Sequence, residues 1–100
     1  MSTYLMLMKM GAGGAGVDNE SITDAISEGA PEARKLVESF GGKVNGIYIT
    51  MGQYDFAAIV EFPNDESCAR AALKLREFGD STETMRAFPE SEWPGIAKGA

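Results

Sequence analysis

The stretch Thr50-Met51-Gly52-Gln53-Tyr54-Asp55-Phe56-Ala57-Ala58-Ile59-Val60-Glu61-Phe62 decides the fold of this chain. One β-rich run ends just before Gly52-Gln53, and a second begins directly after it. Two residues between such runs, with Gly first, are typical of a type II′ hairpin turn, because that position needs a positive φ. We therefore expect strands over residues 43–51 and 54–62 that pair as antiparallel neighbours.

Outward from this hairpin, the chain alternates between strand and helix patterns. Apolar residues at helical spacing predict helices over residues 31–40 and 64–78, the second capped by Asn64 or Asp65. Apolar runs over residues 3–10 and 82–88 predict the first and last strands. Residues 21–28 form a candidate short helix that Gly29-Ala30-Pro31 breaks or kinks.

The resulting order, β-α-β-β-α-β, is the ferredoxin-like pattern. Right-handed crossovers then place the first and third strands at the centre of a four-stranded antiparallel sheet, with both helices on one face. A chain of 100 residues with 44% hydrophobic content fits one compact domain. We predict a single α+β domain over residues 1–100, with a glycine-rich insertion at 11–30 and a polar tail, containing Trp93, at 89–100.

Alternation divides the strand residues into two sets, one for each face of the sheet. The compact aliphatic set, expected beneath the helices, comprises Leu5, Leu7, Ile47, Ile49, Ala57, Ile59, Met85 and Ala87. The opposite set comprises Tyr4, Met6, Met8, Met10, Val44, Tyr48, Thr50, Phe56, Ala58, Val60, Phe62, Thr84, Arg86 and Phe88. The second set is too apolar to face water, and a patch of this kind usually marks an interface or a ligand site. We therefore expect two copies to pack these faces together as a dimeric α+β barrel, with room for a pocket between sheet and partner.

Composition excludes several classes of function. The formal charge is −6 and basic residues do not cluster, so neither nucleic acid nor an anionic membrane is an expected partner. The chain has no histidine and one cysteine, which excludes His-dependent catalysis, His-ligated zinc and disulfides within the chain. Cys68 is expected to be a small buried hydrophobe. A secretory signal and a membrane-spanning apolar run are both missing from the pattern, which makes a cytoplasmic protein the default expectation.

Three groups of residues resemble a known family. They are Gly52-x-Tyr54-Asp55, the following Ala58-Ile59-Val60-Glu61 with Pro63-x-Asp65, and the closing run over residues 82–88. Together they resemble the GYD domain family of small bacterial proteins. That resemblance implies the ferredoxin-like fold and kinship with dimeric α+β barrel proteins, but little about activity, since the family is largely uncharacterised. Residues 11–30 depart from the family pattern, which has a shorter connection.

The glycine-rich run Gly11-Ala12-Gly13-Gly14-Ala15-Gly16 matches the G-x-G-x-x-G spacing of dinucleotide sites. Its context does not fit, because the elements that follow cannot form a βαβαβ mononucleotide-binding half. We favour a flexible insertion over a phosphate site. The nearby Asp18, Glu20 and Asp24 lack the spacing of an EF-hand and are expected to be solvated. No metal or cofactor is expected.

The ligand-pocket candidates are Tyr4, Met6, Tyr48, Tyr54, Asp55, Phe56, Thr84 and Arg86. Tyr54 and Asp55 could orient or deprotonate a ligand, but we favour a structural role in which Asp55 accepts backbone N–H bonds around the turn. Arg86 needs a partner on so apolar a strand face. That partner is either a carboxylate (Glu61, Asp55 or one from another subunit), or solvent at the strand end, or an anionic ligand held by the guanidinium.

These observations favour a homo-oligomeric protein, either structural or binding a small apolar or anionic molecule, without catalytic machinery. The alternative is a small cofactor-independent enzyme of the monooxygenase or isomerase kind. Kinship alone supports that alternative, and Tyr48, Tyr54, Asp55 and Arg86 would then position the substrate.

Overall fold

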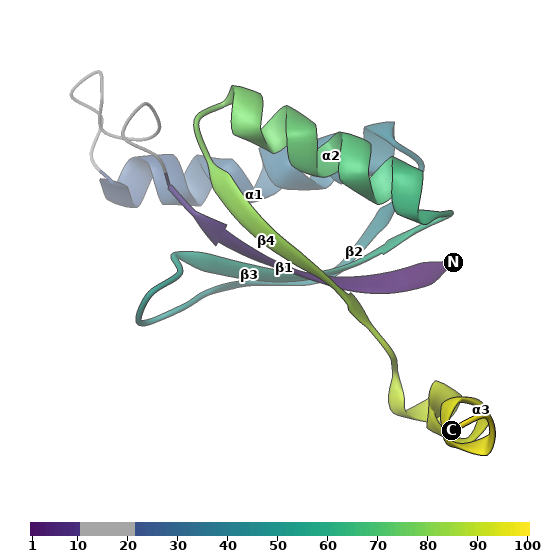
Figure 1. Ribbon diagram of the computed structural model, residues 1–100. Helices are drawn as coiled ribbons and strands as arrows, with labels where there is room; N and C mark the ends of the chain where they lie inside the picture. Colours follow the sequence, from purple (N-terminus) through teal and green to yellow (C-terminus); the bar gives the residue numbers. More distant parts are fainter. Residues whose placement is uncertain (11–21) are drawn as a thin grey trace.

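The protein forms an α+β fold in which two helices cover one face of a four-stranded antiparallel sheet (Figure 1). The computed structural model describes residues 1–10 and 22–100. The elements are β1 (Ser2–Lys9), α1 (Ile22–Ser39), β2 (Lys43–Ile49), β3 (Phe56–Phe62), α2 (Asp65–Glu77), β4 (Ser81–Ala87), a 3-10 turn η1 (Glu90–Glu92) and α3 (Trp93–Lys98). The strand order is β2-β3-β1-β4. This confirms the predicted ferredoxin-like arrangement, with β1 and β3 at the centre.

Helix α1 is longer than the sequence pattern predicts. Of the break or kink expected at Gly29-Ala30-Pro31, the break is wrong, because one helix runs through Pro31. A proline inside a helix removes one backbone N–H donor and crowds the preceding turn, but packing along the rest of the helix can outweigh that cost. Val37, in the part of α1 that covers the sheet, supplies such packing. The expectations for the Gly11–Gly16 run lie outside the described residues.

The hairpin between β2 and β3 is confirmed, but the predicted two-residue turn is wrong. The connection spans residues 50–55, and the Thr50 N–H donates to the Asp55 carbonyl at 3.0 Å across its base. Gly52 does have a positive φ, 130°. The loop is wider because Asp55 is held by β1: its N–H donates to the Met8 carbonyl at 2.9 Å.

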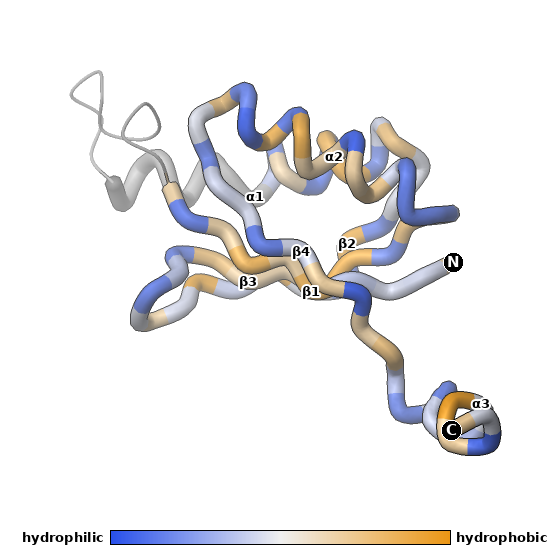
Figure 2. The backbone as a smooth tube through the Cα atoms, in the orientation of Figure 1, coloured by the Kyte–Doolittle hydropathy of each residue, from blue (hydrophilic) through white to orange (hydrophobic). Residues whose placement is uncertain are grey.

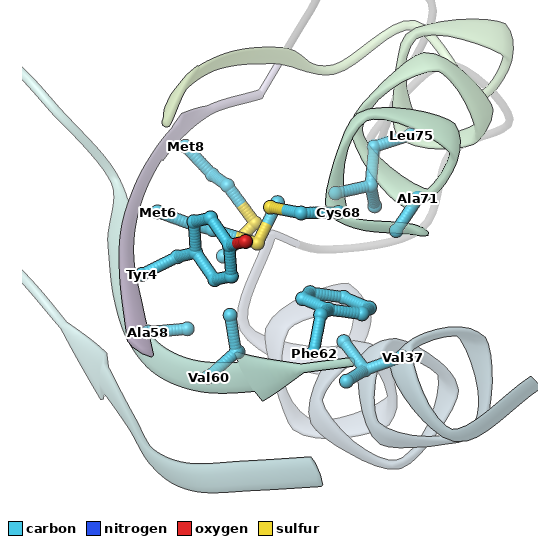
Figure 3. Close-up of a cluster of buried hydrophobic side chains, with 10 residues drawn as sticks. All are labelled: Tyr4, Met6, Met8, Val37, Ala58, Val60, Phe62, Cys68, Ala71 and Leu75. Atoms are coloured by element: carbon cyan, nitrogen blue, oxygen red, sulfur yellow. The ribbon is translucent and has the colours of Figure 1, made fainter. Parts of the chain in front are cut away.

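The core lies on the opposite face of the sheet from the one expected. The buried side chains come from β1 (Tyr4, Met6, Met8), β3 (Ala58, Val60, Phe62), α1 (Val37) and α2 (Cys68, Ala71, Leu75), and they meet between sheet and helices (Figure 3). Assigning the Tyr4, Met6 and Met8 set to the bare face was therefore wrong. Alternation shows which residues share a face, but it does not show which face is covered when both are apolar. The larger side chains of this set fill the space beneath the helices, where Phe62, Met6 and Val60 are the largest fully buried ones.

The bare face carries the aliphatic set that was expected under the helices. The pairing register places Leu5 opposite Ile59 and Met85, and Leu7 opposite Ala57. These positions alternate with the buried ones along β1, so they point away from α1 and α2. Among the described residues, the sheet therefore keeps one apolar face that no helix covers, although the residues of that face differ from those predicted.

Strand β2 departs from simple alternation because its register shifts between Val44 and Gly46. Val44 and Ile47 consequently both pack against the core, whereas Tyr48 pairs with Ala57 and points to the bare face. Gly46 suits this position, since a Cβ there would lie 2.7 Å from the Tyr48 hydroxyl oxygen. The bulge therefore lets β2 pair with β3 although the side chains of β2 do not alternate regularly between the two faces.

Helix α2 begins and ends as its sequence predicts. The Asn64 side chain caps the N-terminus by accepting a hydrogen bond from the Ser67 N–H at 2.9 Å. Gly79, with φ 91°, follows the C-terminus. Cys68 is only 3% exposed, which confirms its expected role as a small buried residue.

The C-terminal segment, predicted only as a polar tail, is partly helical. After β4 the chain forms η1 and α3, and this arm extends away from the sheet on the side opposite α1 and α2 (Figure 1). Hydrophobic positions occur along β1 and again in α3 at the end of the arm (Figure 2). Within the arm, the Trp93 Nε1–H donates to the Phe88 carbonyl at 2.9 Å.

Candidate ligand-binding groove

An open groove of about 790 Å³ lies between α2 and the edge strand β4. Helix α2 contributes Asp65, Cys68, Ala69, Ala72, Leu73 and Arg76 to its lining, while the sheet contributes Tyr4, Ser81, Thr82, Thr84 and Arg86. The groove has the size of a small-molecule site. One wall is therefore a flank of α2 that carries both charged and apolar side chains, and the other is the side of β4 that faces the helices.

Tyr4 and Asp65 join the two walls at one end of the groove. The Tyr4 hydroxyl donates to Asp65 Oδ1, and the Tyr4 ring packs edge-on against Phe62 with 5.9 Å between centroids. Burial, and then the bond to Asp65, raises the pKa of the Tyr4 phenol above its ordinary value of 10.0. Tyr4 is therefore a neutral hydrogen-bond donor at physiological pH and a poor proton acceptor.

Cys68 lies beside this pair but is not a reactive thiol. Burial, together with the nearby Asp65 carboxylate, raises the pKa of the Cys68 thiol to about 11. A thiol must ionise to act as a nucleophile, so this residue remains unreactive near neutral pH. Its contribution to the groove is apolar surface.

Arg86 is held by backbone carbonyls and aromatic rings. Its Nη1 donates to the carbonyls of Thr3 and Ala87, both at 3.0 Å. The guanidinium carbon lies 5.4 Å from the Tyr4 ring centroid and 4.5 Å from that of Phe88. In the described part of the chain, no carboxylate lies within ion-pair distance of Arg86. The expected partners Glu61 and Asp55 therefore do not neutralise it.

Thr84 carries unused hydrogen-bonding capacity on the same wall. Its side-chain oxygen is buried and has no hydrogen-bond partner among the described residues. A buried hydroxyl without a partner costs about 1–3 kcal/mol. Thr84 is therefore a place where a polar group of a ligand could be accommodated after rotation of the side chain.

Tyr54 and Asp55 lie outside the groove, at the end of the β2–β3 connection. The Asp55 Oδ2 accepts a hydrogen bond from the Met10 N–H at 2.7 Å, and the Tyr54 hydroxyl contacts Glu83. The Tyr54 carbonyl accepts a bond from the Thr50 hydroxyl. Asp55 thus has the structural role favoured from the sequence, linking the turn to the end of β1.

This turn contains the motif that marks the chain's family. The family model described as GYD domain matches residues 4–97. The chain belongs to the GYD domain family. No curated protein and no solved structure shows a significant match to it. In this GYD domain, the Gly52-x-Tyr54-Asp55 motif holds the β2–β3 connection against β1 and Glu83 of β4, away from the groove.

The GYD domain brings together only part of the predicted site. Tyr4, Thr84 and Arg86 line the groove. Met6 is buried in the core and Phe56 packs against it, while Tyr48 is exposed on the bare face. With Tyr54 and Asp55 in the β2–β3 connection, the candidates therefore fall into four separate environments.

Sequence reasoning missed the α2 wall of the groove. Asp65, Ala69, Ala72 and Arg76 recur at i, i+4, i+7 and i+11 and so share one helix flank. Only the apolar stripe beside them stands out in the sequence, because the flank mixes charged and small residues. To recognise that flank as one wall of the groove, one must also know which side of β4 faces the helices.

Two further features of the GYD domain concern metals and membranes. Within residues 1–10 and 22–100, no three acidic, Cys or His side chains gather as a metal-binding group. Across the same residues, no helix combines the length and the apolar character needed to cross a bilayer.

Proposed function

We propose that this GYD domain is a homodimeric small-molecule-binding protein. A second copy covers the bare face of the sheet, and each copy holds a ligand in its own groove between α2 and β4. The observation that carries the dimer is the apolar bare face, and the groove supports the binding role. The bare face and the groove lie on opposite sides of the sheet, so a second copy that packs on the bare face leaves the groove open.

The bare face has the character of an interface. Ile59 and Met85 remain 39% and 41% exposed near its centre, with Leu5 and Leu7 between them on β1. Contiguous apolar surface of this kind on a small protein usually marks a site of association. Covering it removes that surface from water, which stabilises the complex by roughly 25 cal/mol per Å² buried.

The charges on this face favour a second copy as the partner. Lys43 pairs across the sheet with Glu61, and Lys9 and Glu83 occupy further positions on the same face. A two-fold interface needs a surface that is complementary to itself. A face with both signs at its border and aliphatic residues at its centre meets that requirement, whereas a one-sign face would not.

The C-terminal arm adds to this argument. It projects on the bare side of the sheet (Figure 1), where a second copy would sit. Trp93 and Ile96 on the arm are 57% and 49% exposed. An amphipathic Trp and an Ile on a projecting helix are suited to packing against a neighbouring subunit. The C-terminal arm of each copy would therefore pack against the other subunit.

The oligomeric state tests the dimer directly. Light scattering after gel filtration should give about twice the monomer mass for the native chain at micromolar concentration. Ile59→Lys should shift the protein toward monomer, because a charge would enter the centre of the interface. Met51→Lys is the matched control, since Met51 is fully exposed at the β2–β3 connection and should leave the mass unchanged. If the native chain remained monomeric over a wide concentration range, that result would contradict the proposed dimer.

The enzymatic alternative receives less support from the groove. Among its groups able to exchange protons, Tyr4 and Asp65 are bound to one another, and the Tyr4 phenol and the Cys68 thiol both have raised pKa values. Such a pair orients and polarises a ligand more readily than it removes a proton from it. Binding is therefore the role that the groove supports best.

A further inference from the structure

We infer that the groove between α2 and β4 binds an amphipathic carboxylate, with Arg86 holding the carboxylate group and α2 receiving the apolar part. This inference rests on the proposed binding function, whose ligand class it names. It follows from the state of Arg86, the balance of charge in the groove and the apolar flank of α2.

Arg86 is oriented in advance for an anion. Two hydrogen bonds from Nη1 to backbone carbonyls and the flanking rings of Tyr4 and Phe88 fix the plane of the guanidinium. Among the described residues, the hydrogen bonds of this guanidinium come from Nη1 alone, so the edge formed by Nε and Nη2 remains for a ligand. That edge matches the two oxygens of a carboxylate in a bidentate pair.

The charge of the groove is opposite to that of the chain. The described residues that line it include Arg76 and Arg86 but a single carboxylate, Asp65, which already accepts a bond from Tyr4. The whole chain carries a formal charge of −6. A local excess of positive charge in so acidic a protein concentrates small anions there rather than at the rest of the surface.

The groove suits a carboxylate better than a phosphate. Phosphate sites typically use a free helix N-terminus or several converging donors. The N-terminus of α2 is already capped by Asn64, and Asp65 and Glu66 occupy its first turn. Asp65, which lines the groove, repels a multiply charged anion more strongly than a monoanion, and one oriented guanidinium is sufficient for a monoanion.

The remaining walls favour an organic molecule with an apolar body. Ala69, Ala72 and Leu73 line the α2 side, and Cys68 adds the surface of a neutral thiol. A volume of about 790 Å³ exceeds the needs of an inorganic ion, which would leave this apolar surface wet. Thr84 offers its unpartnered hydroxyl to a polar substituent between the two ends.

Calorimetric titration with decanoate, decanol and inorganic phosphate tests the inference on the full chain. We expect decanoate to bind at least tenfold more tightly than decanol, and phosphate not to compete. Arg86→Gln should reduce decanoate affinity at least tenfold and leave decanol binding unchanged, with Arg86→Lys intermediate. Arg70→Gln is the matched control, because Arg70 pairs with Glu66 on the exposed side of α2 and should not alter decanoate binding.

The outcomes separate this inference from the proposed function. Equal binding of decanoate and decanol would overturn the carboxylate assignment, although the groove would still be a binding site. If phosphate displaced decanoate, the groove would be a site for inorganic anions and the carboxylate assignment would be wrong. If Arg86→Gln fails to fold, the amide signals of Thr82 and Ala72 in the native chain decide, since the inference requires decanoate to shift both. Light scattering on the same samples reports the dimer independently of either ligand.

Discussion

Replacing Thr84 with valine should stabilise the protein in the absence of ligand. The Thr84 side-chain oxygen is buried without a hydrogen-bond partner in the described structure, opposite the fully buried Met6 of β1. Leaving such an oxygen unsatisfied costs about 1–3 kcal/mol. Valine has nearly the same shape and a similar preference for strands, so the substitution removes this cost without opening a cavity. We expect the free energy of unfolding to rise by about 1–2 kcal/mol, or roughly 5–10 °C in Tm for a domain of this size.

Urea denaturation followed by circular dichroism, at one fixed protein concentration, measures this change. Thr82→Val is the control, because Thr82 lies two residues away on the same side of β4 and its hydroxyl is not among the buried unpartnered atoms. It should change stability by less than about 0.5 kcal/mol. A destabilised Thr84→Val protein, or one no more stable than the control, would show that the hydroxyl is already satisfied. The same variant should bind decanoate about as tightly as the native chain does, since decanoate has no polar group between its ends for the Thr84 hydroxyl to contact.

Three further substitutions test the fold itself. Asn64→Ala should lower the free energy of unfolding by about 1 kcal/mol through loss of the cap on Ser67, whereas Asn64→Asp should retain most of it, as measured by urea denaturation. Gly42→Ala should destabilise by about 1–3 kcal/mol, because its Cβ would lie 2.7 Å from the Glu61 carbonyl oxygen; Gly95→Ala, with open space around it, should not lower the Tm. The pKa of the Cys68 thiol is raised from an ordinary 9.0 to about 11, so the contribution of this residue to the free energy of unfolding is fully present below pH 9 and is lost progressively between pH 9 and 11. Cys68→Ala should flatten that part of the pH profile, and an unchanged slope would contradict the assigned pKa.

The order and type of the elements could be predicted because their signals are local. The Asn64 cap, the glycine that ends α2 and the helical spacing of apolar residues each depend on a few neighbouring positions. Pro31 shows the limit of that reasoning, since a local breaker was outweighed by packing that the sequence does not reveal. The turn at Gly52 shows the same limit, because contacts with β1 set its width.

The faces of the sheet and the α2 wall depend on non-local information. Alternation correctly grouped Tyr4, Thr84 and Arg86 on one side, but two apolar sides gave no basis for choosing the covered one. The rotation of α2 about its axis, which brings Arg76 to the groove, is set by packing against the sheet. The grouping of strand residues was therefore predictable, and the complete site was not.

The hydrogen bond from the Met10 N–H to Asp55 has a consequence for folding specificity. If β1 slipped by one residue against β3, Leu5 and Leu7 would replace Tyr4, Met6 and Met8 beneath the helices. The core would still be filled by apolar side chains, so the hydrophobic effect separates the two alignments only weakly. A side chain that reaches one particular N–H at the end of β1 can separate them. The aspartate of the GYD motif therefore favours the observed alignment of β1 by the free energy of one charge-assisted hydrogen bond, about 1.5–3 kcal/mol.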